Sequence, residues 1–234
     1  MIKSLASIKN IKEASLMADY DFDIIDIKNI DDGPLGYAGN KEVELISNEL
    51  NNRILSVTAG NSDHPNKDII YERLEFLNSL KIDYIKIGIF DINYLEMHSI
   101  FLKKAFNLNI KTVGVLFADN NIDINIIKKI CKLDYDGLMI DTIKKSSKST
   151  LDIMDDNLIN SFVSECHKIK KFCGLSGSMQ QNTIEYAMKF KSDFIGFRGA
   201  LCSPNSRDNI ESIQCQNIIK IIKNINQKMY QEAV

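Results

Sequence analysis

The sequence of 234 residues contains no tryptophan, only three prolines and three histidines, and five cysteines without a CxxC pair. Scattered cysteines without metal-ligand spacing argue against a zinc site and a disulfide framework, so we expect reduced thiols and no metal. No apolar run approaches the roughly 20 residues of a membrane span. The N-terminus also lacks the apolar stretch of a signal peptide, so we expect a cytoplasmic protein.

The charge is nearly balanced, with a net value of -2. A chain without an excess of basic residues is not expected to bind nucleic acid or a membrane surface. We therefore expect a small-molecule partner, and the composition leaves a homo-oligomer open. No Ser-, Gly- or Pro-rich linker divides the chain, which predicts one domain over residues 1–234.

A repeated pattern predicts short buried strands. Four apolar segments open with Asp, namely those beginning at Asp23, Asp83, Asp136 and Asp193. Together with the segments between them, they give eight candidate strands at 1–7, 23–28, 54–58, 83–88, 112–117, 136–141, 172–176 and 193–198. Amphipathic periodicity predicts helices at 72–80, 94–106, 126–133, 157–171, 183–190 and 210–229.

Alternating strands and helices indicate the α/β class, with either an open doubly wound sheet or a closed barrel. A dinucleotide-binding sheet would carry a GxGxxG motif after its first strand, and this chain has none there. Eight units in a chain of this length favour a single (β/α)8 TIM barrel.

Three lysines occupy unusual positions. Lys28 and Lys86 interrupt apolar runs that otherwise resemble buried parallel strands, and Lys145 follows the segment 137–144. A buried ammonium is costly and its pKa falls on burial. Because a neutral amine attacks carbonyl carbon, these positions indicate amine–carbonyl chemistry.

Two aspartates accompany the lysines. Asp26 and Lys28 lie two positions apart, so both side chains face the same side of one strand, and Asp141 ends a later strand. In a barrel the carboxyl ends of the strands form the active site, where these side chains would converge. The alternative is a structural network of buried ion pairs, Asp26 with Lys28 and Lys86 with Asp141.

A second group of residues follows the last two strands. The segments Ser176–Gly177–Ser178 and Arg198–Gly199 lie where barrels commonly bind phosphate through backbone N–H groups. Arg198 could add a bidentate contact. Each segment alone is also typical of an ordinary turn.

The sequence indicates no specific function for several other polar residues. Asp119 is either a site acid or a helix cap. The segment 31–36 is consistent with a plain turn. His64 and His98 have no partner pattern, and we expect surface or helix positions for them.

Taken together, these segments resemble the (5-formylfuran-3-yl)methyl phosphate synthases of methanofuran biosynthesis. The matching segments run in the family's order over nearly the whole chain, at 23–29, 83–88, 139–142, 175–178 and 196–200. The chain differs at Ser203–Arg207, where the family has a glycine-rich stretch, so one phosphate contact should differ. It also has an extra residue between Asp141 and Leu151, and Lys145, rather than Lys144 or Lys148, matches the family's lysine.

The resemblance implies a barrel without metal or cofactor. It implies a carbon–carbon lyase that condenses two molecules of glyceraldehyde 3-phosphate to a furan aldehyde phosphate, with loss of phosphate and water. Matching residue by residue implies a catalytic set, with Lys28 as the Schiff-base amine, that consists of Asp26, Lys28, Lys86, Asp141 and Lys145. Two alternatives remain: a class I aldolase-type barrel for another phosphorylated sugar, and a barrel that binds a phosphorylated metabolite without catalysis.

Overall fold

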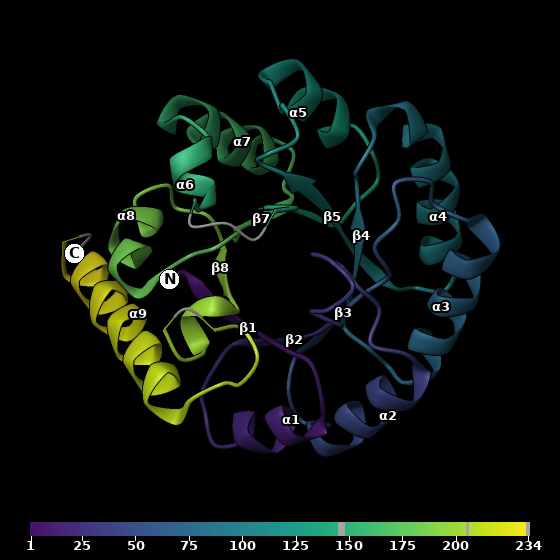
Figure 1. Cartoon of the computed structure of the whole chain (residues 1–234). Helices are drawn as coiled ribbons and strands as arrows, with labels where there is room; N and C mark the ends of the chain where they lie inside the picture. Colours follow the sequence, from purple (N-terminus) through teal and green to yellow (C-terminus); the bar gives the residue numbers. More distant parts are fainter. Residues whose placement is uncertain (145–147, 205, 233–234) are drawn as a thin grey trace.

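The computed structural model describes residues 1–144, 148–204 and 206–232, and its eight parallel strands form a closed barrel in sequence order (Figure 1). All eight expected strands are present, and the TIM barrel is confirmed. The strands are β1 Lys3–Ile8, β2 Ile24–Ile27, β3 Leu55–Thr58, β4 Tyr84–Gly88, β5 Lys111–Phe117, β6 Gly137–Asp141, β7 Phe172–Leu175 and β8 Phe194–Phe197.

Helices surround the barrel. They are α1 Ile11–Met17, α2 Asn40–Glu49, α3 Lys67–Ser79, α4 Leu95–Asn107, α5 Ile124–Cys131, α6 Thr150–Ile153, α7 Asp156–Lys168, α8 Ile184–Met188 and α9 Ser212–Glu232, with short 3-10 turns η1 Ile92–Tyr94, η2 Gln181–Thr183 and η3 Gly199–Leu201. The six expected helices are present, and α1, α2 and α6 are additional. The expected helix 157–171 ends early because Lys170 adopts a left-handed φ of 61°, which turns the chain into β7.

The aspartates that open the even-numbered strands share one structural role. Each accepts a hydrogen bond from a backbone N–H at the start of the preceding strand, at 2.7 or 2.8 Å: Asp23 from Ser4, Asp83 from Leu55, Asp136 from Thr112 and Asp193 from Cys173. An unpaired N–H at the end of a ladder costs free energy, so the repeated Asp completes the sheet at the amino-terminal end. The sequence repeat therefore corresponds to a fourfold repeat of the structure.

Alternating residues of the strands build two apolar cores. One lies between the strands and the helices and includes Ile25, Ile27 and Val57. The other fills the barrel interior, where Phe194 packs across Gly174. A Cβ at Gly174 would lie only 2.1 Å from the Phe194 ring, so the small residue makes room for the large one. Because this interior is apolar, the polar side chains of the barrel lie toward the carboxyl ends of the strands.

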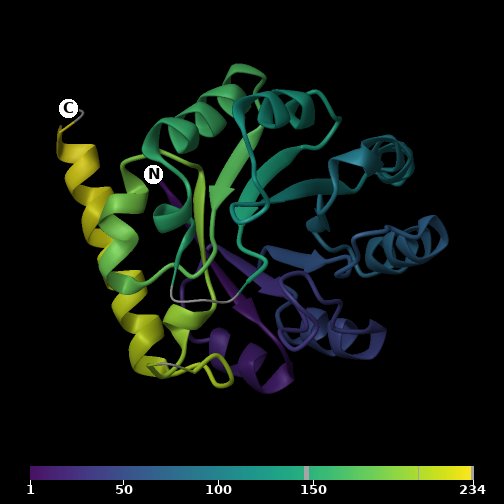
Figure 2. The ribbon, with the colours of Figure 1, turned by 45° about the horizontal axis from the view of Figure 1, so that its top comes forward.

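Helix α9 runs along the outside of the barrel and contacts the N-terminal segment (Figure 2). Asn226 of α9 receives the N–H of Ile2 at 3.0 Å and donates to the Ile2 carbonyl at 2.9 Å. This pair anchors the segment before β1. Across the described ranges, no helix combines the length and apolar character that crossing a bilayer requires.

Candidate active site

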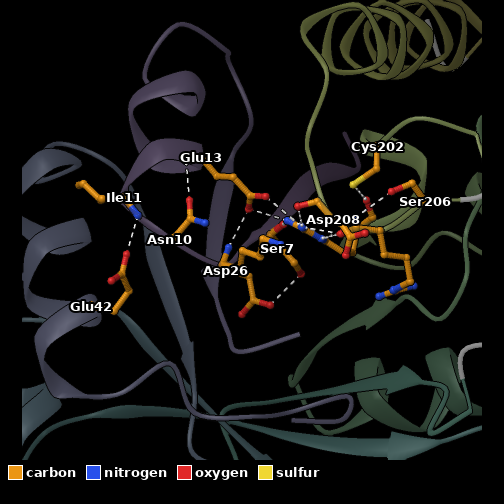
Figure 3. Close-up of polar contacts among 12 residues, drawn as sticks. Ser7, Asn10, Ile11, Glu13, Asp26, Glu42, Cys202, Ser206 and Asp208 are labelled. Atoms are coloured by element: carbon orange, nitrogen blue, oxygen red, sulfur yellow. Dashed lines mark hydrogen bonds and ion pairs between the residues drawn. The ribbon is translucent and has the colours of Figure 1, made fainter. Parts of the chain in front are cut away.

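Asp26 is the centre of a buried polar cluster inside the barrel. Its Oδ2 accepts hydrogen bonds from Lys86 Nζ at 2.6 Å and Ser7 Oγ at 2.9 Å, and its Oδ1 accepts one from Ser56 Oγ at 2.6 Å. Ser7, Asp26 and Ser56 are in register on β1, β2 and β3, which is why they meet at one level (Figure 3 draws Ser7 and Asp26). The carboxylate is fully buried and Lys86 is only 2% exposed.

The charge state of Asp26 follows from these neighbours. Burial acts to raise its pKa, but the positive charges of Lys86 and Lys28 and the hydrogen bonds from Lys86 and Ser56 outweigh burial and lower it. Asp26 is therefore an ionised carboxylate at neutral pH. The sequence left open two ion pairs, Asp26 with Lys28 and Lys86 with Asp141. The structure shows a different pairing, in which Lys86 contacts Asp26 directly.

Lys28 and Asp141 border a cavity at the carboxyl ends of the strands. Lys28 lies just after β2, is 4% exposed, and its Nζ is 3.4 Å from the carbonyl oxygen of Pro34. Asp141 ends β6 and accepts the N–H of Thr142 at 2.7 Å. Both side chains line the same cavity, whereas Lys86 does not border it. Lys145 lies outside the described residues.

The loop after β7 forms another wall of that cavity, with Ser176, Gly177 and Ser178. Gly177 and Ser178 have positive φ of 93° and 52°, and a Cβ at Gly177 would lie 2.5 Å from Thr150 Oγ1. Glycine is therefore required at this position. The tight turn at Gly177 brings the backbone of this loop, with Ser176 and Ser178, to the cavity wall.

The loop after β8 completes the cavity with Arg198 and Gly199. Arg198 forms a buried ion pair with Glu13 of α1, with Nη1–Oε2 and Nη2–Oε1 distances of 2.6 and 3.0 Å. Its other N–H groups bind backbone carbonyls of Ser7, Arg207 and Asp208. The sequence predicted Arg198 as a direct phosphate ligand, and here it is engaged by the protein itself.

A larger cavity opens at the opposite end of the barrel. It has a volume of about 250 Å³ and is lined by the aromatic rings of Tyr84, Phe172 and Phe194. From the amino-terminal end of the strands it extends to Ser56 and Lys86. Its walls also carry Lys3, Ser56 and Lys86, but neither Lys28 nor Asp141 nor the two glycine-containing loops. The cavity at the carboxyl ends holds Lys28, Asp141 and the two glycine-containing loops, and is therefore the candidate active site.

Several other candidates have structural roles. Asp119 is not a helix cap; its carboxylate accepts the N–H groups of Ile143 and Lys144, both at 2.8 Å, and ties down the segment after β6. His98 is a buried helix residue rather than a surface one, and its Nδ1 is 2.6 Å from the Tyr135 hydroxyl.

The sequence predicted no metal site, because its cysteines lack the spacing of metal ligands. Within the described residues, however, His167, Cys173 and Asp193 place one potential metal ligand each within 4.8 Å of one another. The Asp193 carboxylate there already accepts the Cys173 N–H at 2.7 Å and lies 3.0 Å from His167 Nε2. The group lies at the amino-terminal end of β7 and β8, away from Lys28.

Sequence reasoning missed four residues of the site. Ser7 and Ser56 are polar residues at inward positions of strands, and strand alternation could have identified them. Glu13 gave no signal, because an acidic residue in the first turn of a helix is ordinary. Arg207 appeared only as part of a segment that differs from the related family.

In a comparison with models of protein families, the family described as 4-HFC-P synthase matches residues 4–222 of this chain. The (5-formylfuran-3-yl)methyl phosphate synthase of Methanococcus aeolicus is 30% identical over 231 residues, with 94% of this chain and 97% of the relative covered. The synthase of the same name from Methanocaldococcus jannaschii is 28% identical over 217 residues, with 88% and 92% covered.

Solved structures are similar in fold. Phosphoribosyl anthranilate isomerase from Thermus thermophilus superposes with a TM-score of 0.69 at 8% identity, with 96% of this chain and all of that chain covered. The corresponding values for 3-hexulose-6-phosphate synthase from Salmonella typhimurium are 0.68, 14%, 96% and 100%. At these identities the similarity concerns the barrel and not the reaction.

Proposed function

Because this chain belongs to the 4-HFC-P synthase family, we propose that it condenses two molecules of glyceraldehyde 3-phosphate into (5-formylfuran-3-yl)methyl phosphate through a lysine imine. Atom balance requires one phosphate and two water molecules to leave. The observation that supports this proposal is a buried amine, Lys28, in the same cavity as Asp141 and two glycine-containing loops.

Lys28 is the nucleophile in this proposal. Its amine attacks the aldehyde carbon of the first triose phosphate, and loss of water gives the imine. Lys86 is a poorer choice, because it is held by Asp26 at 2.6 Å and does not border the cavity. The position of Lys28 at the cavity wall therefore supports Lys28 over Lys86 as the nucleophile.

The imine makes the adjacent C–H acidic, and its deprotonation gives an enamine. Electrons from the enamine expel phosphate from the neighbouring carbon of the first triose. Joining to the carbonyl of the second triose and dehydrative ring closure follow, and the second phosphate remains in the product. Asp141 borders the cavity and is the nearest candidate to move these protons, and the ion pair of Asp26 and Lys86, which lies beneath the cavity wall, is proposed to assist it.

The phosphate groups are proposed to bind the loops that follow β7 and β8. Ser176, Gly177 and Ser178 offer hydroxyl and backbone donors from one side, and Gly199 opens a 3-10 turn whose first N–H groups have no partner within that turn. Lys145 stays in the proposed catalytic set through the family resemblance alone.

Trapping of the imine tests this proposal. The protein is incubated with glyceraldehyde 3-phosphate and borohydride, the adduct is located by peptide mass spectrometry, and furan absorbance is followed without borohydride. We expect an adduct on Lys28 and a furan product, both abolished by Lys28→Met. Lys171→Met is the matched control, because this half-buried lysine binds the carbonyls of Leu133 and Tyr135 away from the cavity.

The outcomes separate the alternatives. An adduct on Lys86 would keep the chemistry and move the nucleophile. An adduct with another sugar phosphate, without furan, would favour a class I aldolase-type reaction. Folded protein that gives neither adduct nor product would refute the imine mechanism and favour a barrel that only binds a phosphorylated metabolite.

A further inference from the structure

Arg198 has no N–H group left for a substrate while its present contacts hold. A guanidinium has five N–H donors. Nε binds the Arg207 carbonyl at 3.0 Å, Nη1 binds Glu13 and the Ser7 carbonyl, and Nη2 binds Glu13 and the carbonyls of Arg207 and Asp208. Figure 3 shows Glu13 pointing from α1 toward the segment that carries Ser206 and Asp208. Arg198 therefore fastens this segment to β1 and α1.

The neighbouring Arg207 is in the opposite situation. Its backbone carbonyl is held by Arg198 at 2.6 Å, but its guanidinium donates no hydrogen bond within the part of the chain that the structure describes. The side chain is half-buried and lines the same cavity as Lys28 and Asp141. A guanidinium removed from water with its donors unused is costly unless a partner arrives.

The surroundings of Arg207 suit an anion. A Cβ at Gly199 would lie 3.6 Å from Arg207 Nη1, so the guanidinium lies against the start of η3. The N–H groups of Gly199 and Ala200 open that turn, and Ser176 and Ser178 line the same cavity. Burial lowers the pKa of Arg207 and the nearby Asp141 raises it, but arginine remains charged at neutral pH. Asp141 influences Arg207 through its charge, and no hydrogen bond or ion pair joins the two side chains.

We propose that Arg207 binds the phosphate group of the substrate, and that Arg198, locked to Glu13, is a positioning residue that holds the Arg207 backbone in place. This inference rests on the proposed function for the identity of the substrate, but not for the binding of a phosphate. Since an arginine fork matches two phosphate oxygens, Arg207 supplies the bidentate contact that the sequence had suggested for Arg198. It also gives a role to Arg207, which lies in the stretch where the chain differs from the related family.

Direct titration with inorganic phosphate tests the inference without any turnover. We expect Arg207→Met to weaken phosphate binding by about 10- to 100-fold, as for loss of hydrogen bonds to a charged group. Arg207→Lys should fall between, because one ammonium replaces the fork. Lys189→Met is the control for loss of one positive charge, since Lys189 is exposed over the Tyr186 ring beyond the end of α8, and it should change affinity less than about twofold. Folding of Arg207→Met is expected, because Arg198 holds only the backbone at this position.

Kinetics give the second readout. Arg207→Met should raise KM for glyceraldehyde 3-phosphate by a similar factor, while borohydride trapping of Lys28 by unphosphorylated glyceraldehyde stays at the wild-type level. Arg198→Lys keeps a cation beside Glu13 but loses most of the N–H groups that hold the segment. It should raise KM with little change in kcat, and a loss of kcat alone would contradict a positioning role.

The outcomes distinguish this inference from the proposed function. Phosphate binding that depends on Arg207 in a protein that makes no furan would retain the inference and remove the reaction. Equal phosphate affinity in wild type and Arg207→Met would overturn the inference, even in an active synthase. The same holds if the wild type shows no saturable phosphate binding.

Discussion

The buried pair of Glu13 and Arg198 gives a quantitative prediction. Their side chains are 8% and 3% exposed, so neither charge is solvated by bulk water. Removing one member of such a pair leaves the other buried and unpaired, which costs about 3–5 kcal/mol. Glu13→Gln keeps the shape of the side chain and removes only the charge. We therefore expect the free energy of unfolding to fall by about 3–5 kcal/mol.

Urea unfolding measures this loss through the midpoint, provided that the slope stays unchanged. In a domain of this size each kcal/mol shifts Tm by about 2–4 °C, so Tm should fall by roughly 6–20 °C. Asp21→Asn is the control, because Asp21 and Lys223 form a pair of similar length, 2.7 Å, whose side chains are 81% and 58% exposed. An exposed pair contributes about 0–1 kcal/mol.

A loss below about 1 kcal/mol for Glu13→Gln, similar to the control, would refute the reasoning. It would mean that Arg198 finds water or another partner when Glu13 is neutral. Because Glu13 also accepts the Lys9 N–H at 2.8 Å, part of the effect could come from the helix start. Repeating Glu13→Gln in an Arg198→Met background separates the two, since only the ion-pair contribution disappears there.

Three further predictions concern stability. Burial lowers the pKa of His98 from 6.5 to about 4, so the folded state keeps it neutral. As pH falls, the unfolded state takes up the proton before the folded state does, so the free energy of unfolding should decline between pH 6.5 and about 4. His98→Gln should flatten that decline in urea midpoints measured across this pH range. An unchanged pH dependence in the variant would contradict this prediction. Gly174→Ala places a Cβ 2.1 Å from the Phe194 ring and should lower stability by about 1–3 kcal/mol in thermal unfolding, whereas a neutral effect would mean that the ring moves aside freely. Asp136→Ala removes the acceptor for a backbone N–H at the start of β5 and should cost about 1 kcal/mol in urea unfolding, more than Ala at the neighbouring exposed Asp134.

Much of the fold could be predicted from local patterns. Apolar runs, helical periodicity and the repeated Asp before every second strand gave the eight strands and six of the helices. The boundaries differed where the chain turns through a left-handed residue such as Lys170, because lysine carries no sequence signal for that conformation. The charges of Asp26 and Lys86 in buried strands, and of Lys28 directly after one, could also be recognised from the sequence, because each interrupts or ends an apolar run.

The sequence by itself determined the strands, most of the helices and the chemical groups available; the tertiary structure decided which of these groups meet. Lys86 pairs with Asp26 because β2, β3 and β4 stand in a particular register, and no local pattern encodes that register. Glu13 and Arg198 are 185 residues apart and meet because β8 closes onto β1. That closure engages the donors of Arg198 and leaves those of Arg207 facing the cavity. Partner choice among buried charges depends on distances of a few ångströms, which only the closed barrel sets.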